Sequence, residues 1–142
     1  MKIKGLIVLL LTMMMSLNIS AQTSKGSYAQ QFLLKNNNTT YSFIEKWHDT
    51  DFDCDMSEGI ILKFNGKNKT IWGKAWESDE AEFRGSYTLS GYNIIINTDY
   101  EFIGKNGVIK GYFAKDMKSL TITNYEADNE YINHKKVLKL KK

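Results

Sequence analysis

Apolar and polar side chains alternate along most of the chain from residue 41 onward, which is the pattern of β-strands with one buried face. The alternation is clearest over residues 81–89, where Ala, Phe, Gly, Tyr and Leu take every second position and Glu, Arg, Ser and Thr lie between them. The same pattern predicts strands over residues 41–47, 59–64, 69–76, 92–96, 100–103, 108–114, 120–125 and 131–140. Residues 28–34 fit either a short helix or a first strand.

Short turns separate these segments. Asn65-Gly66, Ser90-Gly91 and Asn106-Gly107 contain residues that accept positive φ, and such pairs are typical of β-hairpins. The connections are too short for a crossover helix, so we expect antiparallel pairing. Because open strand edges promote aggregation, the meander is expected to close. The sequence therefore predicts an all-β domain, a small antiparallel up-and-down barrel of about eight strands, with a two-sheet β-sandwich as the alternative.

The N-terminus has the pattern of a cleavable export signal. Lys2 and Lys4 precede an apolar run over residues 6–17, and small polar residues lead to Ala21. The run is shorter than the ~20 residues that a transmembrane helix needs. We therefore predict cleavage near Ala21, a periplasmic or secreted location, and no transmembrane segment afterwards. The predicted organisation is a signal peptide over 1–21, a flexible leader or short N-terminal element over 22–40, and a β-barrel domain over 41–142.

Removal of the signal lowers the charge of the chain. The whole sequence has 142 residues and a formal net charge of +3. Without Lys2 and Lys4, 17 basic residues face 16 acidic ones, and the net charge is +1. A nearly neutral chain gives no reason to expect a nucleic-acid partner. Cys54 is the only cysteine, so we expect no internal disulfide. We expect Cys54 to be a buried small hydrophobe, with a free thiol as the alternative.

Several motifs resemble the lipocalin-like domains of small secreted proteins from Bacteroidetes-type bacteria. They are Ile44-Glu45-Lys46-Trp47, the segment from Ile61 to Gly66, the run from Gly85 to Ile96, and the late strand from Ser119 to Thr123. The family usually has glycine where this chain has Glu45. The arginine pair of small fatty-acid carriers is absent, since Arg84 is the only arginine. The resemblance covers residues 41–140 and implies a small barrel that binds a small molecule.

Five aromatic residues are the candidate ligand-binding residues: Trp47, Trp72, Trp76, Phe83 and Tyr87. Trp72 and Trp76 share a face of their strand, and an aromatic-lined barrel interior suits an apolar or sugar ligand. The alternative is that these rings fill the barrel core. Lys74 lies between the two tryptophans on the same face, which indicates that this face is not wholly dry.

The stretch from His48 to Glu58 contains four alternating aspartates: Asp49, Asp51, Asp53 and Asp55. Converging carboxylates bind hard cations, so these four residues form a weak candidate calcium site. Cys54 stands where an EF-hand needs glycine, and Ile60 stands where it needs glutamate, which excludes that motif. The alternative is a solvated acidic loop between two strands.

The sequence offers no catalytic or cofactor motif. Its two histidines, His48 and His134, lie in no recognisable nucleophile or zinc pattern. We therefore expect a protein that is not an enzyme, without catalytic residues and without a cofactor. The lysines at positions 135, 136, 139, 141 and 142 are expected to protect an exposed strand edge. The alternative is that they contact anionic lipid or surface polymer.

Two functions are compatible with these features. The first is an exported lipocalin-like binding protein for a small apolar or amphipathic ligand. The second is a protein–protein interaction module, such as an inhibitor, an immunity protein or an envelope accessory protein, whose partner is an envelope protein and whose contact surface includes residues 48–58.

Overall fold

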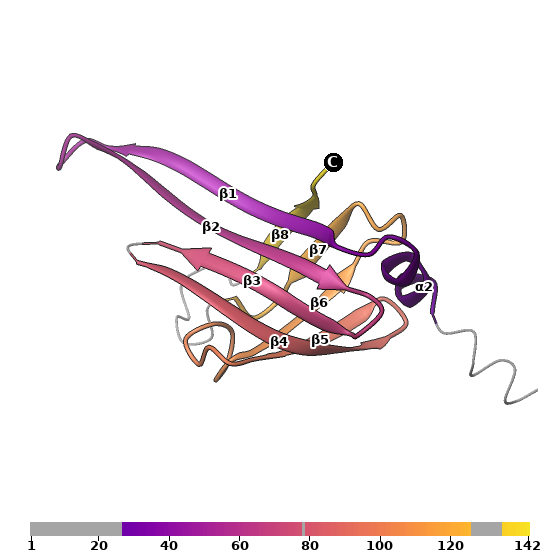
Figure 1. The fold of residues 1–142 in the computed structure, drawn as a ribbon. Coiled ribbons are helices and arrows are strands. Elements are labelled where there is room, and N and C mark those ends of the chain that lie inside the picture. The colour runs from indigo at the N-terminus through magenta and orange to yellow at the C-terminus, as the bar shows by residue number, and fades with distance from the viewer. Residues whose placement is uncertain (1–26, 78, 126–134) are drawn as a thin grey trace, which may run out of the picture.

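The strands form a closed antiparallel barrel. The computed structural model describes residues 27–77, 79–125 and 135–142. Within these residues the elements are α2 (Tyr28–Lys35), β1 (Thr39–Asp49), β2 (Cys54–Asn65), β3 (Thr70–Trp76), β4 (Glu80–Ser90), β5 (Asn93–Thr98), β6 (Val108–Phe113), β7 (Ser119–Ile122) and β8 (Lys136–Leu140). Each strand pairs with the next, and β8 pairs with β1 (Figure 1). The predicted up-and-down barrel is confirmed, and the β-sandwich alternative is wrong.

The alternation along each strand separates the core from the surface. Inward side chains of β1, β2, β4 and β6 meet as an aromatic cluster in which Tyr41, Phe64, Tyr87 and Phe113 lie with ring centroids 5.3–5.8 Å apart. Tilted and edge-to-face rings at this spacing attract one another beyond their burial of apolar area. The hydroxyl of Tyr41 donates a 2.7 Å hydrogen bond to the carbonyl of Met117. The middle of the barrel is therefore filled with packed side chains.

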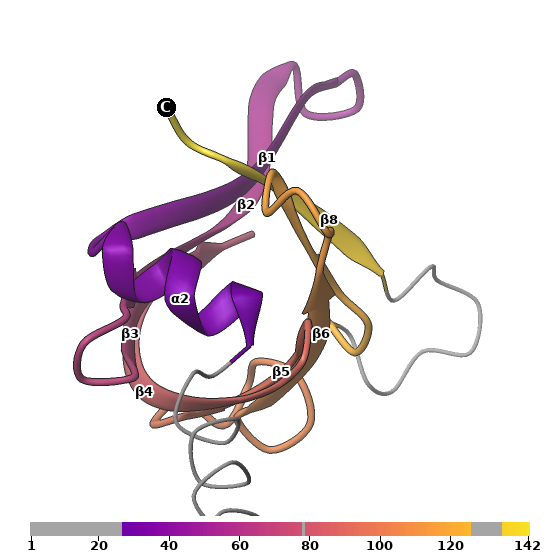
Figure 2. The same cartoon turned by 90° about the vertical axis from the view of Figure 1, so that its right-hand side faces the viewer.

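Helix α2 lies across one end of the barrel (Figure 2). Ser27 caps its N-terminus by accepting a hydrogen bond from the backbone of Gln30. Ala29 and Leu33, on the helix face toward the barrel, are fully buried. The two buried residues lie one helical turn apart on the same face, as expected for a helix that closes an opening with one side. Of the two alternatives for residues 28–34, the helix is correct.

The Asn65-Gly66 turn differs from its prediction. The turn extends over residues 66–69, and its positive φ belongs to Lys69, at 53°. Gly66 is required for another reason, because a Cβ there would lie 2.1 Å from the carbonyl oxygen of Leu33 in α2. The glycine permits close packing of the turn against the helix backbone.

Strands β1 and β2 continue beyond the barrel as a hairpin, here called the arm (residues 44–58). Their pairing continues to Asp49 and Cys54, whereas β3 joins β2 only from Gly59. The arm projects from the end of the barrel opposite α2 (Figure 1). The expected acidic loop over residues 48–58 is therefore mostly strand, and only residues 50–53 form the turn. Alternating aspartates fit a two-stranded ribbon because both of its faces are exposed to solvent.

Three other segments differ from the expected strands. Residues 101–103 form a turn that buries Ile103 instead of a strand. Strand β7 ends at Ile122, earlier than predicted, and β8 begins at Lys136. The expected signal peptide, and residues 131–134 of the last predicted strand, lie outside the described residues. Within the described ranges, no helix has the length and apolar character that crossing a membrane requires.

Candidate ligand site at the open end of the barrel

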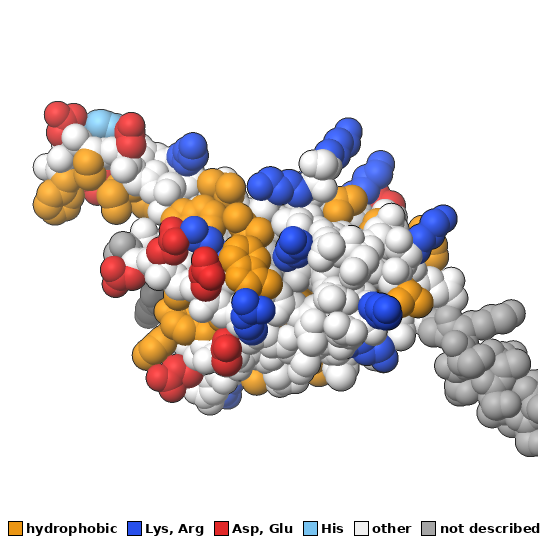
Figure 3. Space-filling model, in the orientation of Figure 1, with side chains coloured by type: hydrophobic (Ala, Val, Ile, Leu, Met, Phe, Trp, Pro, Cys, Tyr) orange, Lys and Arg blue, Asp and Glu red, His pale blue; other side chains and the backbone are white. Residues whose placement is uncertain are grey.

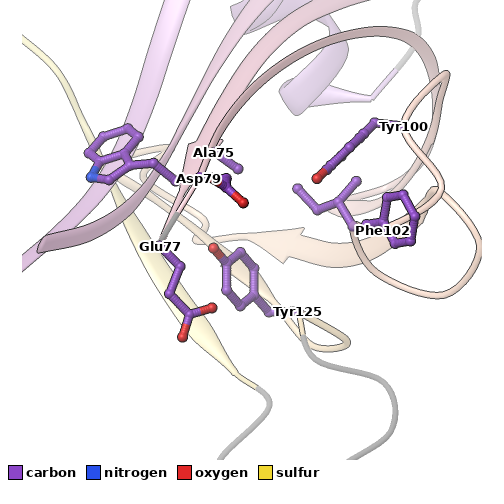
Figure 4. A pocket seen from close by; sticks show the side chains of 8 residues that line it. Ala75, Glu77, Asp79, Tyr100, Phe102 and Tyr125 are labelled. Carbon is purple, nitrogen blue, oxygen red and sulfur yellow. The ribbon is translucent and has the colours of Figure 1, made fainter.

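A pocket of about 290 Å³ lies at the end of the barrel opposite α2. Its lining comes from the end of β3, the β3–β4 turn, the turn after β5 and the residues after β7 (Figure 4). The lining residues are Ala75, Trp76, Glu77, Asp79, Tyr100, Phe102, Ile103 and Tyr125. This volume is near the lower limit of small-molecule sites, so it suits a compact ligand.

Aromatic rings form one side of this pocket. The ring of Tyr100 stacks on buried Phe83, with centroids 6.2 Å apart and planes 12° from parallel. Phe102 packs edge-on against Tyr100 at 5.5 Å, and it is 77% exposed. The rings thus extend from the core to the rim, and a ligand at the mouth would contact a continuous aromatic surface.

An ion pair lies beside the pocket. The ammonium of Lys136 on β8 is 2.7 Å from the carboxylate of Glu58 on β2, and these side chains are only 17% and 15% exposed. Glu58 shares its strand face with inward Ile60, and Lys136 shares its face with inward Leu138, so both point into the barrel. Largely buried charges need such a partner.

The same ammonium lies over aromatic rings. Its Nζ is 4.7 Å from the ring centroid of Phe43 and 5.8 Å from that of Tyr125. A cation at this distance from a ring is attracted by the electrons of the ring face. Tyr125 also lines the pocket. The walls of the open end therefore already stabilise one cation.

The rim of the pocket carries negative charge. Glu77 and Asp79 are exposed lining residues, and the ion pairs found in the described part of the chain leave both carboxylates unpaired. The neighbouring Glu80 is instead 2.6 Å from Lys74. Aromatic rings beside unpaired carboxylates form a site with the chemistry to hold a positively charged organic group.

The structure does not bring the five predicted aromatic residues together. Phe83 and Tyr87 point inward and are 2% and 3% exposed, as the core alternative has it. Trp72 and Trp76 lie on the outer face of β3, because Ile71 and Gly73 face the interior. The expectation that the tryptophans line the barrel interior is therefore wrong.

Steric constraints on two glycines account for the outward tryptophans. The ring of Phe83 lies against Gly73 inside the barrel, where a Cβ would be 2.3 Å from the ring. On the outside, the indole of Trp76 covers Gly59, where a Cβ would be 2.4 Å from the ring. The indole also donates a 3.2 Å hydrogen bond to Ser57. Trp76 therefore meets the pocket at its rim.

Trp47 and the four aspartates lie on the arm. Trp47 is 40% exposed. Asp49 accepts hydrogen bonds from the backbone of residues 51 and 52, at 3.0 and 3.3 Å, and so stabilises the turn. Asp53 and Asp55 lie 3.3 and 2.9 Å from the two ring nitrogens of His48.

The calcium hypothesis gains no support from this arrangement. Among the described residues, no three His, Cys, Asp or Glu side chains are grouped so that they could hold a metal ion. Cys54, which we expected to be buried, is exposed because it lies on the arm beyond the core. His48 is likewise on the arm and takes no part in the pocket at the barrel mouth.

The pairing of β8 changes the interpretation of the lysine-rich tail. β8 pairs with β7 from Lys136 to Lys139 and with β1 at Lys139 and Leu140, so it closes the barrel, and only residues 136–138 have no partner on β1. Lys139 is paired on both sides, and Lys136 points into the barrel toward Glu58, so the edge-protection hypothesis is wrong for these two lysines. Sequence reasoning missed the Lys136–Glu58 pair and the lining residues Tyr100, Phe102 and Tyr125. The available signal was the position of Glu58 and Lys136 on the inward faces of their strands.

Comparison with known proteins gives no further assignment. No family model matches the chain, and neither a curated protein nor a solved structure does. The lipocalin-like resemblance therefore stays a prediction that rests on the short motifs of the strands.

Proposed function

We propose that this chain is an exported binding protein that holds a small amphipathic cation at the open end of its barrel. The observation that carries the proposal is the pocket in which the rings of Tyr100, Phe102 and Tyr125 lie beside the carboxylates of Glu77 and Asp79. Packed side chains fill the middle of the barrel, and the ligand therefore binds at the mouth.

The charge of the ligand follows from the charges around the mouth. The two rim carboxylates would repel an anionic headgroup and attract a cationic one, while the aromatic rings contact its apolar part. The one described ammonium inside the mouth, that of Lys136, is already compensated by Glu58. A fatty acid or another carboxylate is therefore the disfavoured ligand.

The test is a binding titration with three probes of similar shape. Benzyltrimethylammonium is the cation, neopentylbenzene is the neutral isostere and phenylacetate is the anion. The fluorescence of Trp76, which lines the pocket, reports binding. We expect the cation to bind most tightly and the anion not to bind.

Two variants connect the titration to this site. Removing both rim charges in Glu77→Gln/Asp79→Asn should weaken binding of the cation by about tenfold, since each exposed charge contributes up to ~1 kcal/mol. Asp51→Asn, which removes a charge at the arm turn, is the matched control and should leave the affinity unchanged. Equal affinity for the three probes, or no effect of the rim variant, would refute the proposal. Native mass spectrometry of protein purified from its own host then identifies the natural ligand.

A further inference from the structure

Part of β2 has an unpaired edge. Strand β2 pairs with β1 from Cys54 to Phe64. Its pairing with β3 begins at Gly59, opposite Trp76, where β3 ends. In the described part of the chain, no strand takes the place of β3 beside residues 54–58. Alternate backbone N–H and C=O groups of this segment therefore face outward without a strand partner.

A groove follows this edge. It lies between Asp55, Met56 and Ser57 on one side and the β3–β4 turn on the other, with a volume of about 590 Å³. The indole of Trp76 forms its inner end, beside Ser57. The groove is thus the continuation of the position that β3 occupies in the barrel, and an added strand has both a backbone partner and a side-chain pocket there.

The charge of the groove defines what fits it. Its lining includes the carboxylates of Asp55, Glu77, Asp79 and Glu80 and a single cation, Lys74, which pairs with Glu80. On the face seen in Figure 3, most acidic side chains gather on the arm and at the open end of the barrel. A basic segment complements this surface. A second copy of the arm does not, because its four aspartates would face like charges.

We infer that an extended, lysine- or arginine-rich segment of a partner protein adds as a strand to β2 beside residues 54–58. Backbone hydrogen bonds to the free edge hold the segment in an extended conformation, and its basic side chains pair with the groove carboxylates. This is strand addition, in which the main chain supplies affinity and side chains supply selectivity. The inference goes beyond the proposed small-molecule site, although Trp76, Glu77 and Asp79 line both.

The experiment uses the mature chain labelled with ¹⁵N and a short peptide of alternating lysine and valine as the probe. We expect peptide-dependent amide shifts and slower hydrogen exchange at residues 54–58. A peptide N-methylated at alternate positions keeps the charge and loses the strand-forming hydrogen bonds, so it should not bind. A glutamate–valine peptide should not bind either.

Two charge reversals separate the groove from general attraction. Asp55 lies in the groove, and Asp55→Lys should weaken binding of the lysine–valine peptide by about fivefold, as expected for the loss of an exposed ion pair. Asp51→Lys makes the same change in charge at the arm turn and should have no more than a twofold effect. Phe102→Ala alters only the mouth pocket, so it should weaken binding of the small cation and leave the affinity for the peptide unchanged.

Four results would overturn the inference. They are no binding of the lysine–valine peptide, equal binding of the N-methylated peptide, equal losses in the two charge reversals, and protection of residues 54–58 by self-association without peptide. Binding of benzyltrimethylammonium is measured on the same sample, so failure of the peptide site and failure of the mouth site are distinguishable.

Discussion

Lys136 and Glu58 form a 2.7 Å ion pair across β1, between two strands that are not neighbours in the barrel. The ladder between β1 and β8 contains only the pairs Tyr41–Leu140 and Ser42–Lys139. Farther toward the open end, the Lys136 side chain lies over Phe43 of β1 and reaches Glu58 of β2. The pair therefore joins β8 to the rest of the barrel where the backbone ladder has ended.

Breaking this ion pair should destabilise the barrel. Glu58→Gln or Lys136→Met leaves a largely buried polar group with a weaker partner, and we expect each to lower the free energy of unfolding by about 1–3 kcal/mol. The double variant Glu58→Leu/Lys136→Met removes both charges and should recover most of the loss. Urea unfolding measures all three. Single variants as stable as the parent chain would show that the pair contributes nothing.

Gly66→Ala should loosen the closed end of the barrel. The added Cβ would meet the backbone of α2 at Leu33, which cannot move aside as a flexible side chain can. We expect a loss of about 1–3 kcal/mol, the range for overpacking, together with faster hydrogen exchange in α2. Gly91→Ala is the control, because its φ is 62° and nothing lies within 4 Å of the new Cβ. It should cost about 1 kcal/mol of backbone strain and leave α2 unaffected. Unchanged exchange in α2 of Gly66→Ala would contradict the packing argument.

Two buried tyrosines make the fold sensitive to alkali. Burial raises the pKa of Tyr87, and burial together with the charge of Asp116 raises the pKa of Tyr41. Below pH 10 the folded and unfolded states both keep these protons, so their contribution to stability is constant. Above pH 10 the unfolded state releases protons that the folded state retains, and stability falls by up to about 1.4 kcal/mol per pH unit for each tyrosine until the folded state titrates as well.

Tyr41→Phe isolates one of these contributions. At neutral pH the variant loses the hydrogen bond to Met117, which costs about 1 kcal/mol. Above pH 10 its stability should fall less steeply than that of the parent chain, by the share of one tyrosine. The measurement is the urea midpoint of each protein between about pH 8 and about pH 11.5, which covers the onset of tyrosine titration. It gives the pH dependence of stability for the parent chain and for the variant. Identical slopes would refute the assignment.

Substitution of two phenylalanines should change the free energy of unfolding to very different extents. Phe52 is 79% exposed at the arm turn, whereas Phe83 is 2% exposed beneath Tyr100. Phe52→Ser should change the free energy of unfolding by less than about 0.5 kcal/mol, and Phe83→Ala should lower it by about 3–5 kcal/mol. Thermal unfolding compares them. A large loss in Phe52→Ser would mean that the arm turn packs against the barrel.

Much of the fold could be predicted from the sequence, and little of the candidate site could. The inward positions of β4, including Phe83 and Tyr87, follow from period-two alternation because a strand half in water must separate its faces. For Trp72 and Trp76 the pattern predicts the wrong face. On β3 the inward positions are filled by Ile71, Gly73 and Ala75, and small residues give no hydrophobic signal.

The sequence by itself determined the antiparallel strands and the barrel, because alternation and short turns leave few other ways to bury one face of each strand. The tertiary structure alone decided that α2 closes one end, that the arm projects from the other, and that Lys136 meets Glu58. Those relationships depend on the register between strands and on the closure of β8 onto β1. They join residues that are far apart in the chain. Local alternation can place a residue on an inward face, but it does not say which distant residue that side chain contacts.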